Sequence, residues 1–296
     1  MKVILDSVGP CPTAIDAHVV DETLARRRFV SLLRSHGHDA KAIRGELMSI
    51  GWHEKAAENA IAEIFDSKSI SPQLHGRRVG PDLTRLPSRL DLGDRGASVQ
   101  VRVHHPDLCL VGDFLSADEC ERLIADATPL LRRSLIIRAD GVVDENGEEA
   151  YSRTSDQANF LPGASELVDA IQQRVSRFTG WPVTHMENTQ VVRYRPGADF
   201  GPHHDFFDPE AHRGLIDREG QRIATLILYL NTPPDGGVTT FTDIELEIYP
   251  QRGSAVYFAY PQQSPASLTM HSGAPLGRGE KWIATYFLRD RAISQH

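Results

Sequence analysis

Three metal-ligand side chains and one distant cation give this sequence its clearest chemical signal. His203 and Asp205 are separated by one residue, and His271 and Lys281 follow much later in the chain. Because alternate residues of an extended strand share a face, His203 and Asp205 can reach one ion while His204 points away. Two imidazoles and one carboxylate on one side of a metal leave the opposite positions open, as a Fe(II) centre that reacts with O₂ requires. The pattern predicts His203, Asp205 and His271 as Fe(II) ligands.

A histidine-x-aspartate tripeptide occurs often by chance, so its context matters. Pro196-Gly197 and Gly201-Pro202 are turn-forming pairs that can end one strand and start the next, which places the tripeptide at the start of a strand. His204 is the alternative ligand, but it would break the shared-face geometry with Asp205. We therefore predict His203 as the first ligand.

An anionic cosubstrate is predicted from Lys281, which begins an apolar strand ten residues after His271. A buried ammonium group is costly unless it is paired, so an inward-facing Lys281 implies an anionic guest. 2-Oxoglutarate fits, because it chelates iron through one end and carries a second carboxylate at the other. Tyr194 and Thr239 are candidate hydroxyl donors to that carboxylate, with ordinary strand residues as the alternative. Arg278 is the competing cation, but its glycine-flanked turn favours solvent exposure.

Hydrophobic periodicity predicts an α+β, mainly β fold for the elements that position these residues. Many short strands with Gly/Pro turns over residues 98–296 favour a sandwich or barrel, and the metal pattern narrows this to a double-stranded β-helix, or jelly roll, with flanking helices. The run 223–230 is almost entirely apolar, as in a strand buried on both faces. One helix is expected after a Ser116-Glu119 capping box and a second over 164–178. Strands are expected at 98–105, 189–195, 222–230, 238–241, 245–250, 254–260, 267–271 and 281–288.

Two further regions precede the jelly roll. Residues 1–66 predict a small all-α module, in which Asp39 caps a helix and Gly37 and Gly51 end helices. It could dock a partner or simply pack on the main domain. Residues 67–97, rich in Pro, Gly and charge, predict a linker or wrapping segment whose arginine pair at 77–78 is solvated.

Composition disfavours several classes of function. The 296 residues are 40% hydrophobic and 24% charged, as in soluble globular proteins. A net charge of −8 argues against a nucleic-acid partner. No stretch approaches the roughly 20 apolar residues of a transmembrane helix, and the N-terminal apolar run is too short for a signal peptide, so no membrane partner is expected. Cys11, Cys109 and Cys120 lack CxxC spacing, which favours the reducing cytoplasm.

Several ordered motifs resemble the prolyl 4-hydroxylase family of 2-oxoglutarate/Fe(II)-dependent dioxygenases over roughly residues 108–289. They are SRTSDQANFL at 152–161, QVVRYRPGADFGPHHDFF at 190–207, RIATLILYLN at 222–231, GGVTTF at 236–241 and HSGAPLGRGEKWIATYF at 271–287. A lysine ten residues after the last histidine favours this branch over relatives with an arginine nearby. The resemblance implies a dioxygenase of the procollagen-proline 4-dioxygenase type.

The resemblance also implies roles for individual residues. His203, Asp205 and His271 would bind Fe(II), and Lys281, assisted by Tyr194 and Thr239, would bind 2-oxoglutarate. O₂ is the second cosubstrate and ascorbate the expected reductant. A prolyl residue in a peptide or protein would be hydroxylated, with release of succinate and CO₂. The residues expected to line the substrate groove are Arg153, Ser155, Glu187 and Arg222; a structural ion pair between Glu187 and an arginine is the alternative.

Departures from the family pattern affect the substrate and not the metal. Val238 stands where the family usually has an acidic residue, Phe287 where it commonly has tryptophan, and Phe200 where it often has tyrosine. Loops 137–150 and 208–221 are expected to act as lids and to set substrate identity. The principal alternative function is hydroxylation of a free amino acid or other small metabolite.

Two weaker alternatives belong to other classes. Demethylation of an alkylated nucleic-acid base is disfavoured by the acidic chain and by the lack of an arginine-rich stretch after His271. A non-catalytic jelly-roll binding protein would be favoured by a missing ligand or anchor, and the sequence supplies all of them.

Overall fold

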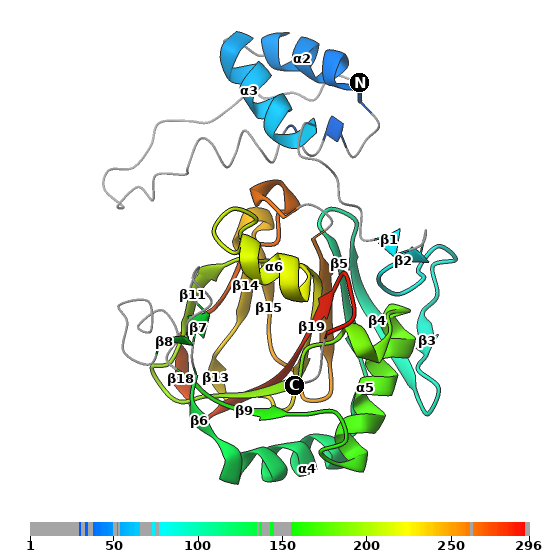
Figure 1. The fold of residues 1–296 in the computed structure, drawn as a ribbon, viewed down its shortest axis with the longest axis vertical. Helices are drawn as coiled ribbons and strands as arrows, with labels where there is room; N and C mark the ends of the chain where they lie inside the picture. Colours follow the sequence, from blue (N-terminus) through cyan, green and yellow to red (C-terminus); the bar gives the residue numbers. More distant parts are fainter. Residues whose placement is uncertain are drawn as a thin grey trace, which may run out of the picture.

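A computed structural model describes residues 30, 33–34, 38–49, 52, 54–65, 73–74, 77–134, 136–137, 143–144, 155–260 and 263–293 of the chain. It is mainly β with few helices, as the sequence predicts, and its two largest sheets share one core, consistent with a jelly roll (Figure 1). Cys11, Gly37, Gly51 and Arg153 lie outside the described residues.

The large sheet has nine strands in the order β3-β4-β5-β16-β12-β19-β10-β9-β6, all of them antiparallel neighbours. Its strands are β3 (Arg89–Asp91), β4 (Gly96–Val103), β5 (Asp107–Gly112), β6 (Arg132–Arg133), β9 (Ser155–Phe160), β10 (Thr189–Tyr194), β12 (Arg222–Tyr229), β16 (Ala255–Ala259) and β19 (Lys281–Arg289).

The smaller sheet has the order β11-β17-β14-β15 and carries both metal-ligand histidines. Its strands are β11 (Phe200–His203), β14 (Thr239–Phe241), β15 (Leu246–Ile248) and β17 (His271–Gly273). Three two-stranded pairs complete the β structure: β1 (Gln73–Leu74) with β2 (Arg77–Arg78), β7 (Ile136–Ile137) with β8 (Val143–Asp144), and β13 (Asp235–Gly236) with β18 (Leu276–Arg278).

Buried apolar side chains cover both faces of the large sheet. One cluster joins its outer face to helices α4 (Ala117–Ala127) and α5 (Glu166–Thr179), and the other fills the space between the two sheets. β12 contributes to both, with Leu226 and Leu228 on the helix side and Ile227 and Tyr229 on the inner side. The prediction of a strand buried on both faces is confirmed.

Local signals explain where α4 and α5 begin and end. The Ser116 side chain accepts a hydrogen bond from the Glu119 amide, and the Glu119 carboxylate accepts one from the Ser116 amide, so the predicted capping box is present. α5 is capped by Ser165 and ends at Gly180, whose φ of 67° is the left-handed conformation that glycine adopts without strain. Both predicted helices are confirmed.

Two described helices precede the sheets, α2 (Ala40–Ser49) and α3 (Glu54–Phe65). Asp39 accepts a hydrogen bond from the Ala42 amide, as its predicted capping role requires. Apolar residues of the pair, among them Ile43 and Leu47, form a cluster that includes Ala266. The helices thus contact the 3₁₀ turn Pro265–Ser267 through Ala266; in Figure 1 they lie above this turn. A separate module over residues 1–66, and partner docking by it, remain predictions.

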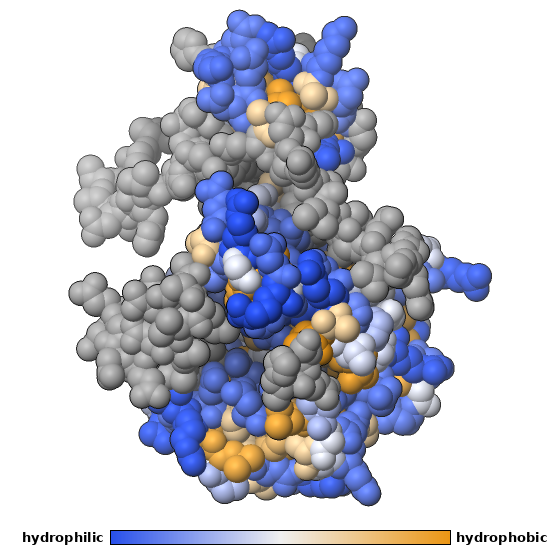
Figure 2. All heavy atoms as spheres, in the orientation of Figure 1, coloured by the Kyte–Doolittle hydropathy of each residue, from blue (hydrophilic) through white to orange (hydrophobic). Residues whose placement is uncertain are grey.

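Three sequence expectations need correction. Part of the proposed linker 67–97 is regular, because β3 pairs with β4 at the edge of the large sheet. The segment 267–271 is not a strand throughout, since Leu268 has a φ of 55° and β17 begins only at His271. The expected loop 208–221 contains helix α6 (Arg213–Glu219), a short helix with no buried residue that lies at a hydrophilic part of the surface in Figure 2.

Membrane-spanning helices are not among the described elements: none is long and apolar enough to cross a bilayer. The solvated arginine pair expected at 77–78 forms β2, and the expected lid at 137–150 is described only in β7 and β8.

Replacement of Ser116 by alanine tests the capping box. The variant removes one acceptor for the Glu119 amide, so the free energy of unfolding is expected to fall by about 1 kcal/mol in urea denaturation. Glu121→Ala on the same helix removes only an exposed ion pair with Arg252 and serves as the control. Equal stability of Ser116→Ala and the parent protein would contradict the capping role.

Candidate metal centre and cosubstrate pocket

The two predicted histidine ligands face each other across neighbouring strands. His203 on β11 and His271 on β17 are direct partners in the antiparallel register, and their ring centroids lie 4.3 Å apart. β11 ends at His203, so Asp205 lies in the following bend and not, as predicted, in the same strand. Its carboxylate nevertheless reaches both rings, with Oδ1 3.4 Å from His203 Nε2 and Oδ2 3.6 Å from His271 Nε2.

The ligand atoms of His203, Asp205 and His271 all lie within 4.8 Å of one another, close enough to hold one ion. Each imidazole is oriented by its other nitrogen: His203 Nδ1 contacts the Gly201 carbonyl at 2.8 Å, and His271 Nδ1 contacts the Thr269 carbonyl at 3.0 Å. A carbonyl accepts only, so both Nδ1 atoms carry the proton and both Nε2 lone pairs face the cluster. The donor set fits a 2-His-1-carboxylate metal.

The protonation states that burial imposes suit metal binding. Burial lowers the pKa of His271 to about 4, so its imidazole is neutral at pH 7, as a ligand must be. Burial alone would raise the pKa of Asp205, but the His271 and His203 rings and the Arg222 guanidinium hold it well below its usual range. The carboxylate is therefore ionised.

His204 takes no part in the cluster. Its ring stacks on Phe206 with centroids 4.6 Å apart, and neither ring nitrogen has a hydrogen-bond partner among the described residues. The structure thus leaves His204 out of the cluster, as predicted, although Asp205 does not share a strand with His203.

Lys281 lies in the same pocket as the ligand cluster. Its side chain is 4% exposed, and Nζ lies 3.4 Å from Thr239 Oγ1. It lies 5.5 Å from the ring centroid of Tyr194 and 5.8 Å from that of Tyr229. Within the described part of the chain Nζ has no ion-pair partner. A buried cation with these neighbours, a hydroxyl group and aromatic rings, fits an anionic guest. Arg278, the competing cation, is exposed as predicted.

The four predicted groove residues are found in different settings. Arg153 lies outside the described residues. Ser155 is buried, and its hydroxyl contacts that of Ser134 at 2.8 Å. Glu187 forms a two-pronged ion pair with Arg222, at 2.6 and 2.7 Å, so the alternative expected for Glu187 is present. The substrate contacts of these residues remain predictions.

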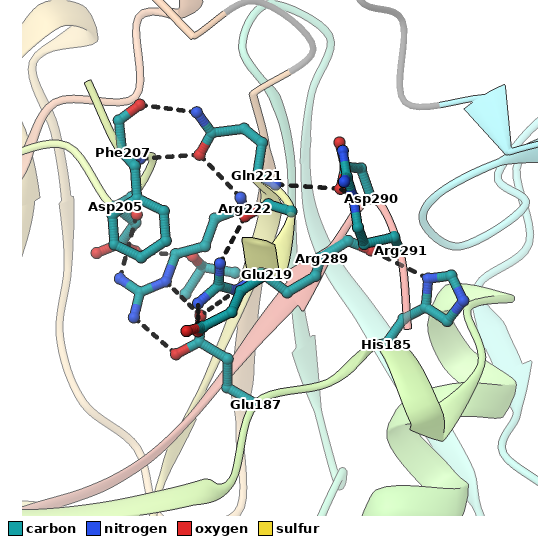
Figure 3. A network of polar contacts seen from close by, with 12 residues as sticks. His185, Glu187, Asp205, Phe207, Glu219, Gln221, Arg222, Arg289, Asp290 and Arg291 are labelled. Atoms are coloured by element: carbon teal, nitrogen blue, oxygen red, sulfur yellow. Dashed lines mark hydrogen bonds and ion pairs between the residues drawn. The ribbon is translucent and has the colours of Figure 1, made fainter. Parts of the chain in front are cut away.

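Arg222 belongs to a larger polar network at the edge of the site, which Figure 3 shows. Arg289 donates to Glu187 Oε1 at 2.6 Å, and Arg222 donates to the Asp205 carbonyl at 3.2 Å. Gln221 Oε1 accepts a hydrogen bond from the backbone amide of Phe207 at 2.9 Å, and Gln221 Nε2 donates to the Phe207 carbonyl at 2.7 Å. These bonds attach the bend that contains Asp205 to the start of β12 and the end of β19.

Sequence reasoning missed several residues around the site. Thr225 donates a hydrogen bond to Asp205 Oδ2 at 2.8 Å, and Tyr229 donates to Thr239 Oγ1 at 2.9 Å. Both lie on β12 at positions that alternate with its helix-side residues, on the same inner face of the large sheet as Ile227, which lines the pocket. That period-two pattern was available, but it lies within an almost entirely apolar run that concealed it. Nothing in the sequence distinguished Arg289 as the second guanidinium partner of Glu187.

Comparison with known proteins yields consistent matches. Residues 189–289 match the family model of the 2OG-Fe(II) oxygenase superfamily. Prolyl 4-hydroxylase 5 of Arabidopsis thaliana is 31% identical over 234 residues, which cover 69% of this chain and 77% of that protein. Prolyl 4-hydroxylase 1 of the same plant is 34% identical over 209 residues, covering 64% and 71%. The viral collagen prolyl hydroxylase of Paramecium Bursaria Chlorella virus-1, solved as a 2OG complex, is 29% identical, covers 62% of this chain and 94% of that one, and has a TM-score of 0.46.

The buried ammonium group predicts a pH dependence of cosubstrate binding. Burial lowers the pKa of Lys281 to about 8, so the free pocket loses its positive charge as the pH rises through 8. The dissociation constant of 2-oxoglutarate is expected to rise about tenfold between roughly pH 7.5 and 9, measured by calorimetry with Mn(II) present. Lys281→Arg, which keeps its charge, is the control and is expected to show a flatter profile. Identical profiles would contradict the assignment.

Replacement of Glu187 by glutamine tests the ion-pair network. Arg222 and Arg289 both lose this carboxylate, and Arg289 keeps the more distant carboxylate of Glu219 at 3.8 Å, so the free energy of unfolding is expected to fall by about 2 kcal/mol at pH 7 in urea denaturation. Asp235→Asn removes only an exposed pair with Arg278 and is the control.

The same two proteins, unfolded in urea at acidic pH, give a second check. Burial alone would raise the pKa of Glu187, but Arg222 and Arg289 lower it. The stabilisation that Glu187 provides is therefore fully present above its pKa in the unfolded chain, which is about 4.3. It is lost as the pH falls through the lower pKa of the folded protein. The stability gap between the parent protein and Glu187→Gln should narrow in acid; a gap that widens would contradict the network.

Proposed function

Because this chain belongs to the prolyl 4-hydroxylase family of 2-oxoglutarate/Fe(II) oxygenases, we propose that it hydroxylates a prolyl residue in a peptide or protein. The family implies Fe(II), 2-oxoglutarate and O₂ as cofactor and cosubstrates, with succinate and CO₂ as coproducts. The observation that carries the proposal is the placement of His203, Asp205, His271 and Lys281 in one pocket of a chain whose relatives are prolyl 4-hydroxylases.

The residues of the pocket have separate tasks in this proposal. His203, Asp205 and His271 hold the metal, and Lys281 with Thr239 and Tyr194 binds the far carboxylate of 2-oxoglutarate. When bound, iron and 2-oxoglutarate supply the oxidising chemistry with O₂. No side chain needs to act as a general acid or base.

The pocket walls complete the proposed site by positioning the target carbon and excluding water. Ile227, Ile283 and Phe287 line it together with the ligand cluster. These apolar side chains leave water few partners near the target C–H bond, and they restrict the orientations that a bound substrate can take.

For the substrate groove, we propose Arg153, Ser155, Glu187 and Arg222. Support for Arg222 comes from its position: its guanidinium carbon lies 3.6 Å from the centroid of Phe287, a residue of the pocket wall. The ion pair with Glu187 holds the guanidinium there, so a structural role and a substrate contact are compatible. Ascorbate as reductant belongs to the proposal, as does a cytoplasmic location, which the buried free thiols of Cys109 and Cys120 favour.

The proposal is tested by incubating the protein with Fe(II), 2-oxoglutarate, ascorbate and O₂. Proline-rich peptides are expected to gain the mass of one oxygen atom, with succinate formed in equal amount. A panel of free amino acids is incubated in parallel. Modification of a free amino acid but of no peptide would overturn the peptide assignment in favour of a small-metabolite hydroxylase.

The metal assignment is tested in the same assay. His203→Ala and Asp205→Ala are expected to abolish substrate-dependent succinate formation, since each removes a ligand. His204→Ala is the matched control: its ring lies outside the cluster, so succinate formation should persist. Activity lost in His204→Ala but retained in His203→Ala would overturn the assignment.

A further inference from the structure

A buried pair of hydroxyl groups lies behind the candidate metal centre. Thr225 on β12 is fully buried, and its hydroxyl donates to Asp205 Oδ2 at 2.8 Å. The Thr225 hydroxyl oxygen lies 2.9 Å from the hydroxyl oxygen of Tyr260, which is also fully buried. The chain Tyr260–Thr225–Asp205 therefore connects the end of β16 to the ligand carboxylate.

The direction of these hydrogen bonds follows from the proton count. A threonine hydroxyl has one proton, and an ionised carboxylate can only accept. Since Thr225 donates to Asp205, it must accept from Tyr260. The tyrosine ring cannot easily turn away, because its backbone amide is bonded to the Ile223 carbonyl and its ring lies among Phe206 and Phe258. Tyr260 thus fixes the rotation of the Thr225 hydroxyl.

The constraint on Asp205 determines how its carboxylate faces the histidines. Thr225 takes up a lone pair of Oδ2, while Oδ1 faces His203 Nε2 at 3.4 Å. Asp205 lies in a bend outside the strand, so its backbone is not held in the sheet. The backbone carbonyl of Asp205 is held separately, by Arg222.

We propose that Thr225 and Tyr260 are positioning residues for the metal centre: Tyr260 orients the Thr225 hydroxyl, which orients the Asp205 carboxylate toward the two imidazoles. The pair acts through Asp205 and touches neither substrate nor cosubstrate. Hydrogen-bond partners of metal ligands typically contribute 10–100-fold to metal affinity. This inference rests on the proposed metal site, and its test separates the two.

The experiment titrates the metal-free protein with Mn(II) and with Co(II). Thr225→Val replaces the hydroxyl by a methyl group of similar volume and is expected to weaken Mn(II) binding about 10–100-fold. It should also change the visible spectrum of the Co(II) form, because the carboxylate is no longer held. Thr225→Ser, which keeps the donor, is expected to restore most of the affinity.

Tyr260 is tested as a member of the same chain of bonds. Tyr260→Phe should weaken Mn(II) binding less than Thr225→Val does, because Thr225 can still donate once its rotation is free. In the Thr225→Val background, Tyr260→Phe should cause no further loss, since the tyrosine acts only through the threonine. Additive losses in the double variant would overturn the order of action.

The matched control is Thr179→Val, at a buried threonine that is hydrogen-bonded to the Val175 carbonyl at the end of α5. It makes the same side-chain change on the helix side of the large sheet, so it should lower the melting temperature of the metal-free protein without changing Mn(II) affinity. A purely structural role for Thr225 would give this same result.

The outcomes separate the inference from the proposed function. If the parent protein binds neither Mn(II) nor Co(II), the metal site itself is wrong, and the inference falls with it. If the parent binds both ions and folded Thr225→Val binds them equally well with an unchanged Co(II) spectrum, only the positioning role is wrong. If Thr225→Val does not fold, Tyr260→Phe decides. A Mn(II) affinity and a Co(II) spectrum equal to those of the parent protein would overturn the positioning role of both residues.

Discussion

The register between β11 and β17 is the constraint on which the site depends. His203 and His271 are 68 positions apart in the sequence, yet they are direct partners across these two strands. A slip of one residue would turn one imidazole to the opposite face of the small sheet, because side chains alternate along a strand. The sheet also includes β14, where Phe241 pairs with His271 and packs within the inner core. Burial of Phe241 therefore helps to place His271 on the inner face through the β14–β17 pairing, and the β11–β17 pairing brings His203 beside it.

β12 connects the two halves of this architecture. Its outward side chains, Leu226 and Leu228, pack in the cluster beneath the helices, and its inward side chains lie between the two sheets, where Ile227 lines the pocket. Among the inward ones, Thr225 bonds the ligand carboxylate and Tyr229 bonds Thr239 beside Lys281. One strand thus aligns the metal end of the pocket with the cosubstrate end. A rigid central strand suits this task, since small misplacements of reacting groups reduce rates strongly.

The sequence was most informative where chemistry and periodicity coincide. Ser116 with Glu119 predicted a helix start from local spacing, and Lys281 predicted an anion pocket from the cost of burying a charge. The residue types of His203, Asp205 and His271 predicted one cluster, although Asp205 reaches it from a bend and not from the predicted strand. Local spacing failed where tertiary contacts decide the conformation. β3 forms only because β4 offers it an edge, and the hydroxyl pair behind Asp205 needs two strands that the sequence cannot bring together. The three-dimensional partner, and not the residue type, supplied the missing information.

The buried cations show how structural charges differ from charges kept for a guest. Arg174 lies between Asp94 and Glu119, and Glu187 pairs with both Arg222 and Arg289, so each guanidinium has a carboxylate within the fold. Lys281 is equally buried, but among the described residues it contacts only a hydroxyl group and aromatic rings. A fold that pairs these arginines and leaves Lys281 without a carboxylate among the residues described bears the cost of that desolvated charge until an anion arrives. The cost explains the lowered pKa of Lys281, and relief of it by a bound carboxylate favours cosubstrate binding.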